Sequence, residues 1–221
     1  MEIIEAIKNR HSVRDYTNQK IEGMVLTELL AEIEACNKES GLHIQLITNE
    51  PDAFGGFMAH YGKFNNVQNY IALVGKKEAD LDEKVGYYGE RIVLKAQQLG
   101  LNTCWVALTF SKRKSKHIIN KGEKLVCVLS LGYGKTQGVS HKSKPLDSVC
   151  KVEGDMPSWF RSGMEAVLLA PTAINQQKFM ITLENGKVAA KSTGGFYSKV
   201  DLGIVKYHFE IGADTDNFLW M

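Results

Sequence analysis

Three short segments of the chain carry side chains that could bind an anion or a polar ring. The first places Arg10, His11, Ser12 and Arg14 within five residues, directly after an expected amino-terminal helix. Guanidinium groups are permanently charged planar donors that suit phosphate oxygens, and a hydroxyl adds a neutral donor. This segment therefore predicts an oxyanion site. The alternative is that these cations only satisfy the carboxyl-terminal dipole of the helix.

The second segment is basic and runs from His141 to Pro145. Lys142 and Lys144 stand two residues apart, and in an extended segment alternate side chains point the same way. Both ammonium groups could then meet one anion. A basic loop that is merely solvated is the alternative interpretation.

The third segment is rich in carboxamides and hydroxyls. It reads Ala-Pro-Thr-Ala-Ile-Asn-Gln-Gln, and its candidate binding residues are Pro171, Thr172, Asn175 and Gln176. Carboxamides offer both donors and acceptors, which suits a heteroaromatic ring or a polyol chain with both kinds of partner. Ordinary turn capping by asparagine is the competing explanation.

Helices and strands alternate along the chain and should position these segments. Apolar residues at the helical period predict helices over residues 2–9, 22–36, 80–99, 159–169 and 199–211, with a basic helix after Ser111 over 111–120. Apolar runs and alternation predict strands over residues 42–48, 70–74, 103–108, 125–131, 179–183, 188–191 and 217–221. Asn185-Gly186 lies between two of them, as in a tight hairpin. The pattern indicates a mixed α+β fold.

Composition places the chain among ordinary globular proteins. The net charge is only +2 over 221 residues, so no overall field favours nucleic acid or an anionic membrane as a partner. The first residues lack the cationic start and apolar stretch of a secretory signal, and no apolar run approaches the roughly 20 residues that span a bilayer. The four cysteines form no CxxC pair. We expect a cytoplasmic protein with no metal site.

Together the three segments resemble the flavin-binding elements of the nitroreductase family. Arg10 to Tyr16 matches the family's Arg-x-Ser-x-Arg-x-aromatic signature, and Ala170 to Gln176 is similar to its Ala-Pro-Ser/Thr-x-x-Asn-x-Gln loop, although Gln176 follows Asn175 directly. Residues 87–105 resemble the central helix and the Gly-Leu-x-x-x-Trp strand, and Lys142 and Lys144 resemble the basic, phosphate-facing tail.

The resemblance implies a fold and a cofactor. The fold is a three-layer α/β/α sandwich with a mainly antiparallel central sheet, forming a single domain over residues 1–221. The cofactor is FMN, whose phosphate would be bound by the Arg10 segment and the two lysines, while Thr172, Asn175 and Gln176 would face the flavin ring or ribityl chain. The flavin would take hydride from NAD(P)H and reduce nitroaromatic, quinone or related small-molecule acceptors by a ping-pong mechanism, without a catalytic side chain. A flavin-storage protein, a dehydrogenase or dehalogenase of the same superfamily, and a nucleotide- or anion-binding protein without flavin remain alternatives.

The order of the segments departs from the family pattern. The Asn-containing loop usually precedes the central helix, whereas here it follows the basic tail. Residues 85–105 and 200–220 also share a 20-residue interval from a helical valine to a tryptophan. The chain is therefore either a homodimer or a pseudo-dimeric monomer, with possible halves at residues 1–145 and 155–221.

Overall fold

The computed structural model describes residues 1–221, which form two compact units. The C-terminal unit comprises Met1–Lys8, Asp82–Arg91 and His141–Met221, and the central unit comprises Asn9–Leu81 and Ile92–Ser140. The sequence-based halves, residues 1–145 and 155–221, and the single domain stay predictions. No helix is long and apolar enough to cross a membrane.

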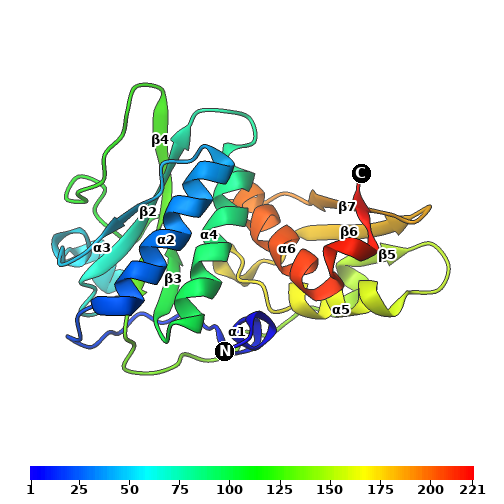
Figure 1. The fold of residues 1–221 in the computed structure, drawn as a ribbon, viewed down its shortest axis with the longest axis horizontal. Helices are drawn as coiled ribbons and strands as arrows, with labels where there is room; N and C mark the ends of the chain where they lie inside the picture. The colour runs from blue at the N-terminus through cyan, green and yellow to red at the C-terminus, as the bar shows by residue number, and fades with distance from the viewer. The chain divides into compact units, whose positions relative to one another are not determined.

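The central unit is built on an antiparallel four-stranded sheet in the order β1-β2-β4-β3 (Figure 1). Its strands are β1 (Gln45–Ile47), β2 (Asn69–Lys76), β3 (Asn102–Val106) and β4 (Glu123–Gly132). Helix α2 (Gly23–Ser40), the short helix α3 (Phe57–Tyr61) and the 3₁₀ turn η1 (Asp52–Phe54) complete it. The middle strands β2 and β4 are almost wholly buried, as their continuous apolar runs require.

The C-terminal unit contains a second, mixed sheet in the order β5-β6-β7-β8. Its strands are β5 (Cys150–Val152), β6 (Phe179–Glu184), β7 (Lys187–Ser192) and β8 (Leu219–Trp220), and its helices are α5 (Ser158–Val167) and α6 (Ser198–Ala213). The 3₁₀ turns are η2 (Leu146–Ser148), η3 (Ala173–Asn175) and η4 (Thr215–Asn217). Asn185 and Gly186 both have positive φ in the β6–β7 hairpin, so the predicted tight turn is confirmed.

Two helices span the boundary between the units along the chain. Helix α1 (Ile3–Asn9) begins in the C-terminal unit. Of helix α4 (Leu81–Gln98), Asp82–Arg91 belong to the C-terminal unit and the residues on either side belong to the central unit. The mixed α+β class predicted from the sequence is confirmed, with the strands divided between two sheets. In both predicted repeats a long helix precedes a strand that holds the tryptophan, but the two sheets differ in strand direction. The duplication stays a prediction.

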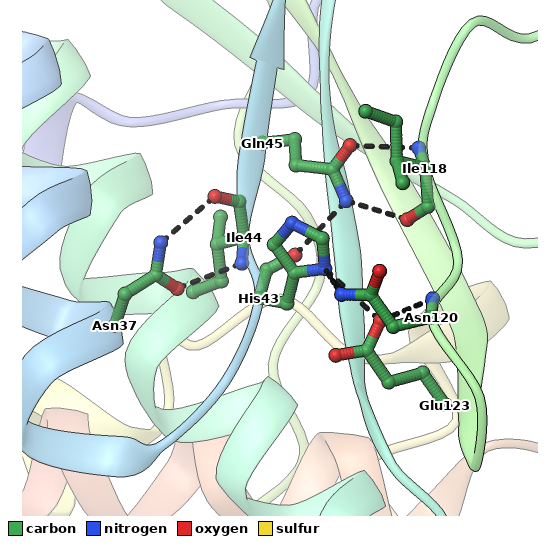
Figure 2. A network of polar contacts seen from close by, with 7 residues as sticks. All are labelled: Asn37, His43, Ile44, Gln45, Ile118, Asn120 and Glu123. Carbon is green, nitrogen blue, oxygen red and sulfur yellow. Dashed lines mark hydrogen bonds and ion pairs between the residues drawn. The ribbon is translucent and has the colours of Figure 1, made fainter.

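The predicted basic helix over residues 111–120 is wrong, since only a turn forms at residues 112–114. Side chains of the sheet bind the backbone of this segment instead (Figure 2). The Gln45 carboxamide donates to the Ile118 carbonyl at 2.8 Å and accepts from the Ile118 amide at 2.8 Å. The Tyr70 hydroxyl accepts from the Lys116 amide at 2.8 Å. Repulsion among the closely spaced cations also disfavours a helix.

The start of β4 is fastened to the same network. Glu123 contacts His43 at 3.0 Å and accepts from the Asn120 amide at 2.7 Å (Figure 2). Burial would raise the pKa of Glu123, but these hydrogen bonds together lower it. Asn37 of α2 brackets the backbone of Ile44 with two hydrogen bonds of 2.7 and 2.9 Å. Polar side chains therefore fix the segments around the edge strand β1.

Candidate functional site

The amino-terminal basic segment lies along β3, an edge strand of the central sheet. Ser12 forms a parallel bridge with Thr103, and the Val13 amide donates to the Thr103 carbonyl at 3.0 Å. Tyr16 fixes the far end of the segment, because its buried hydroxyl donates to the Val13 carbonyl at 2.7 Å and contacts Ser130 at 2.8 Å. The pairing holds the segment in one conformation and places Arg10, Ser12 and Arg14 at alternate positions.

The side chains of this segment differ in exposure. Arg10 is 3% exposed, whereas Arg14 is exposed and its guanidinium lies 5.8 Å from the centre of the Phe64 ring. The Cys104 thiol beside this segment is buried. Burial raises the pKa of Cys104, and Arg14, Ser12 and Arg10 oppose the rise. Two guanidinium groups and a hydroxyl therefore stand at alternate positions of one fixed segment, a donor set suited to an oxyanion.

A glycine allows a second loop to approach this segment closely. Gly138 has φ +72°, and a Cβ there would lie 2.8 Å from the His11 Cβ and 3.1 Å from the Ser12 carbonyl. His11 is half-buried beneath this crossing. The loop residues 134–138 thus pack against the predicted anion site, and any larger side chain at Gly138 would displace the chain there.

The C-terminal unit holds four of the predicted residues in the carboxamide loop, residues 171–177. Three of its residues have positive φ: Ile174 (48°), Asn175 (55°) and Gln177 (46°). A branched residue such as isoleucine rarely adopts this conformation, and Ile174 is also 87% exposed. Pro171 and Thr172 are half-buried at the start of the loop. Contacts with other elements must therefore hold the loop in shape.

The basic segment contacts the carboxamide loop through its backbone. The Lys142 carbonyl accepts from Asn175 Nδ2 and from Gln177 Nε2, each at 3.0 Å. His141 and Ser143 contact the Leu168 carbonyl at 3.0 and 2.7 Å, whereas Lys142 and Lys144 are exposed. The two lysines therefore stand at exposed alternate positions, and their binding of one shared anion stays a prediction.

Gln177 is a site residue that the sequence interpretation missed. Its side chain is 4% exposed, donates to Asn175 Oδ1 at 2.8 Å and accepts from the Lys144 amide at 2.8 Å. The Lys144 ammonium donates to the Gln177 carbonyl at 2.9 Å. The signal was present in the sequence, because Asn175 and Gln177 have the Asn-x-Gln spacing that Gln176 lacks. Gln177 therefore connects the loop to the basic segment.

Asp201 of α6 is the second missed residue. It is 2% exposed and accepts from the Ala173 amide at 2.9 Å and from Gln176 Nε2 at 2.7 Å. Burial raises the pKa of Asp201 to about 6, and the hydrogen bonds from Gln176 and Ala173 offset part of the rise. An acidic residue inside the apolar run of residues 200–205 was the available signal.

We expect Asp201 to make folding stability depend on pH. Its pKa rises on folding from 3.8 to about 6, so in this window the folded state binds more protons than the unfolded state. This contribution to stability is present below pH 3.8 and is lost as the pH rises through about 6. The free energy of unfolding of wild type relative to Asp201→Asn should fall by about 2–3 kcal/mol between pH 4 and pH 7. A difference in unfolding free energy between the two proteins that stays constant across this pH range, measured by urea unfolding, would contradict the raised pKa of Asp201.

The structure thus gathers the predicted residues into two groups. Arg10, His11, Ser12 and Arg14 belong to the central unit, and Lys142, Lys144, Pro171, Thr172, Asn175 and Gln176 belong to the C-terminal unit. Of the aromatics near α3, Phe54 and Phe64 are buried in the core, whereas Phe57 and Tyr61 are exposed. No cluster of three or more His, Cys, Asp or Glu residues could hold a metal ion.

Comparisons with known proteins bear on the family and the fold of the chain. The family model described as "Putative TM nitroreductase" matches residues 2–213. No curated protein matches the chain. A solved nitroreductase structure from Thermotoga maritima has a TM-score of 0.64 and is 25% identical, with 96% of this chain and 83% of that chain covered.

Two further structures match about two thirds of the chain. A nitroreductase family protein from Streptococcus pneumoniae has a TM-score of 0.54 and 13% identity, with 67% of this chain and 98% of that one covered. A nitroreductase from Desulfovibrio desulfuricans, solved in complex with FMN, has a TM-score of 0.53 and 14% identity, with 67% and 94% covered. At these identities the two structures show similarity of fold alone.

Proposed function

The chain belongs to the nitroreductase family, and from that premise we propose that it is an FMN-dependent oxidoreductase. Its electrons would come from NAD(P)H and pass to nitroaromatic, quinone or related small-molecule acceptors. The observation that carries the proposal is the Arg10-Ser12-Arg14 segment, which is fixed along β3 with its donors at alternate positions.

The donor chemistry of both groups fits FMN. Guanidinium, hydroxyl and ammonium donors of Arg10, Ser12, Arg14, Lys142 and Lys144 suit a phosphate monoester and its ribityl hydroxyls. The carboxamide loop offers donors and acceptors for a flavin ring, which carries both kinds of partner. The sequence resemblance supports a contribution of both groups to flavin binding.

The residues of the chain would bind and orient, while the cofactor supplies the redox chemistry. When bound, FMN provides a ring that accepts and donates hydride. Arg10 is permanently charged and buried, so it would stabilise negative charge that develops on a bound group. Asn175 and Gln176 would set the orientation of a ring against the loop. No side chain of the chain is assigned a covalent step.

We expect Arg14→Ala to weaken FMN binding about 10- to 150-fold, because a charge-assisted hydrogen bond contributes roughly 1.5–3 kcal/mol. Arg14 is exposed, so the substitution should leave the melting temperature of the flavin-free protein almost unchanged. Arg10→Ala should weaken binding at least as much, but burial of Arg10 makes a loss of stability part of its effect. The measurement is a fluorescence titration of flavin-free protein with FMN.

Arg113→Ala provides the matched control, since Arg113 is an exposed arginine of the central unit outside the proposed site. Its FMN affinity should equal that of wild type. Failure of the wild-type protein to bind FMN, or equal losses in Arg14→Ala and Arg113→Ala, would overturn the proposal. Addition of NAD(P)H to the FMN-bound protein should bleach the flavin, whereas a storage protein would leave it oxidised.

A further inference from the structure

One carboxylate, that of Asp201, binds both ends of the strained part of the carboxamide loop. Asp201 accepts from the Ala173 amide and from the Gln176 side chain, at 2.9 and 2.7 Å. These two residues flank Ile174 and Asn175, the adjacent residues with positive φ. The carboxylate therefore fastens both ends of the strained pair to α6.

A carboxylate is the side chain that this position requires. Both partners of Asp201 are N–H donors, so both carboxylate oxygens act as acceptors. Asparagine has nearly the same shape but offers one acceptor and one NH₂ group, which would face a donor. Gln176 cannot easily reverse its own amide, because its nitrogen also donates to the Phe196 carbonyl at 2.6 Å.

The backbone at Gly195, which also packs against the Gln176 side chain, leaves that side chain little room. Gly195 has φ +104°, and a Cβ there would overlap the Gln176 side-chain oxygen. The Gln176 carboxamide is thus enclosed by Asp201, Phe196 and Gly195. This enclosure keeps the Gln176 side chain close to its hydrogen-bond partners.

We propose that Asp201 is a positioning residue that holds the carboxamide loop in the conformation that binds the flavin. This inference rests on the proposed function, and it adds a residue that touches the loop instead of the cofactor. The loop geometry would otherwise relax, since positive φ at isoleucine is intrinsically unfavourable. Asp201 binds Ala173 and Gln176, and it thereby fixes the direction of the Asn175 side chain between them.

The test compares Asp201→Asn with wild type at pH 7.5 in two separate measurements. Amide hydrogen exchange of the flavin-free protein reports the loop directly, and we expect the Ala173 and Gln176 amides to exchange about tenfold faster or more in the variant. FMN titration reports the consequence, and the dissociation constant should rise about 10- to 100-fold. Circular dichroism should show that the variant keeps a cooperative unfolding transition.

Two further variants distinguish positioning of the loop from a general loss of stability. Gln176→Met removes one of the two donors and should produce a smaller rise in exchange at Ala173. In the double variant the effects on FMN affinity should be less than additive, because both substitutions break the same bond. Asp214→Asn, at the exposed end of α6, is the matched control and should behave as wild type.

The outcomes also separate this inference from the proposed function. Unchanged hydrogen exchange of the loop amides in flavin-free Asp201→Asn would overturn the positioning role, even if FMN binding fell. Faster exchange with wild-type FMN affinity would overturn it too. Absence of FMN binding by the wild-type protein would instead overturn the proposed function, and the positioning role for flavin with it.

Discussion

Gly203→Ala should destabilise the C-terminal unit by about 3 kcal/mol or more, because α6 and α4 cross there backbone to backbone. A Cβ at Gly203 would overlap the Glu83 carbonyl and would lie 2.6 Å from the Tyr87 nitrogen. The contact is reciprocal, since a Cβ at Gly86 would overlap the Val200 carbonyl. Backbone atoms cannot move aside as a flexible side chain can, so the helices would have to separate.

Chemical denaturation followed by circular dichroism measures this loss. Gly56→Ala is the matched control, because Gly56 has φ −103° and nothing lies within 4 Å of the added Cβ. Its stability should stay within about 0.5 kcal/mol of wild type. A loss below 1 kcal/mol for Gly203→Ala would show that the two helices cross less closely than the structure indicates.

This crossing also affects the candidate site. Asp201 stands two residues before Gly203 on α6, so a displacement of the helix would move the carboxylate that holds the carboxamide loop. Gly203→Ala should therefore weaken FMN binding even under conditions where the protein stays folded. The glycine thus acts through the position of the helix, and its own atoms contact no proposed binding residue.

The sequence was sufficient to predict the elements whose signals are local. Apolar residues at the helical period placed α4 and α6 within one or two residues of their observed ends, and Asn185-Gly186 marked the β6–β7 hairpin. The family prediction, which rested on the Arg10 segment and the loop after Pro171, is confirmed by the match over residues 2–213. Each of these signals lies within about 20 consecutive residues.

Features that depend on contacts between distant residues were not predicted. The segment after Ser111 has a helical pattern, but Tyr70 and Gln45 bind its backbone from 46 and 73 residues away. The role of Asp201 likewise depends on Gln176, 25 residues earlier in the chain. Local propensity contains no information on such partners, so tertiary hydrogen bonds decided both outcomes. The division of the strands between two sheets also depends on contacts between distant residues.

The second large effect is expected at His208, a buried histidine of α6. His208 and Glu90 are both fully buried, and the imidazole Nε2 lies 2.9 Å from Glu90 Oε1. The other ring nitrogen lies 3.0 Å from the Ala166 carbonyl. A carbonyl oxygen only accepts, so Nδ1 carries a proton and Nε2 faces the carboxyl group.

His208→Leu should therefore cost about 3–5 kcal/mol of unfolding free energy, because it leaves the buried Glu90 carboxyl without its imidazole. His60→Leu is the matched control, since His60 is exposed and contacts only a nearby backbone carbonyl; it should change stability by about 0.5 kcal/mol or less. The double variant His208→Leu/Glu90→Leu should be more stable than the sum of its single losses predicts, since it leaves no buried polar group that has lost its partner in the pair. Additive losses in denaturant unfolding would show that the two side chains are not coupled, and that the pair contributes to α4–α6 packing only through its volume.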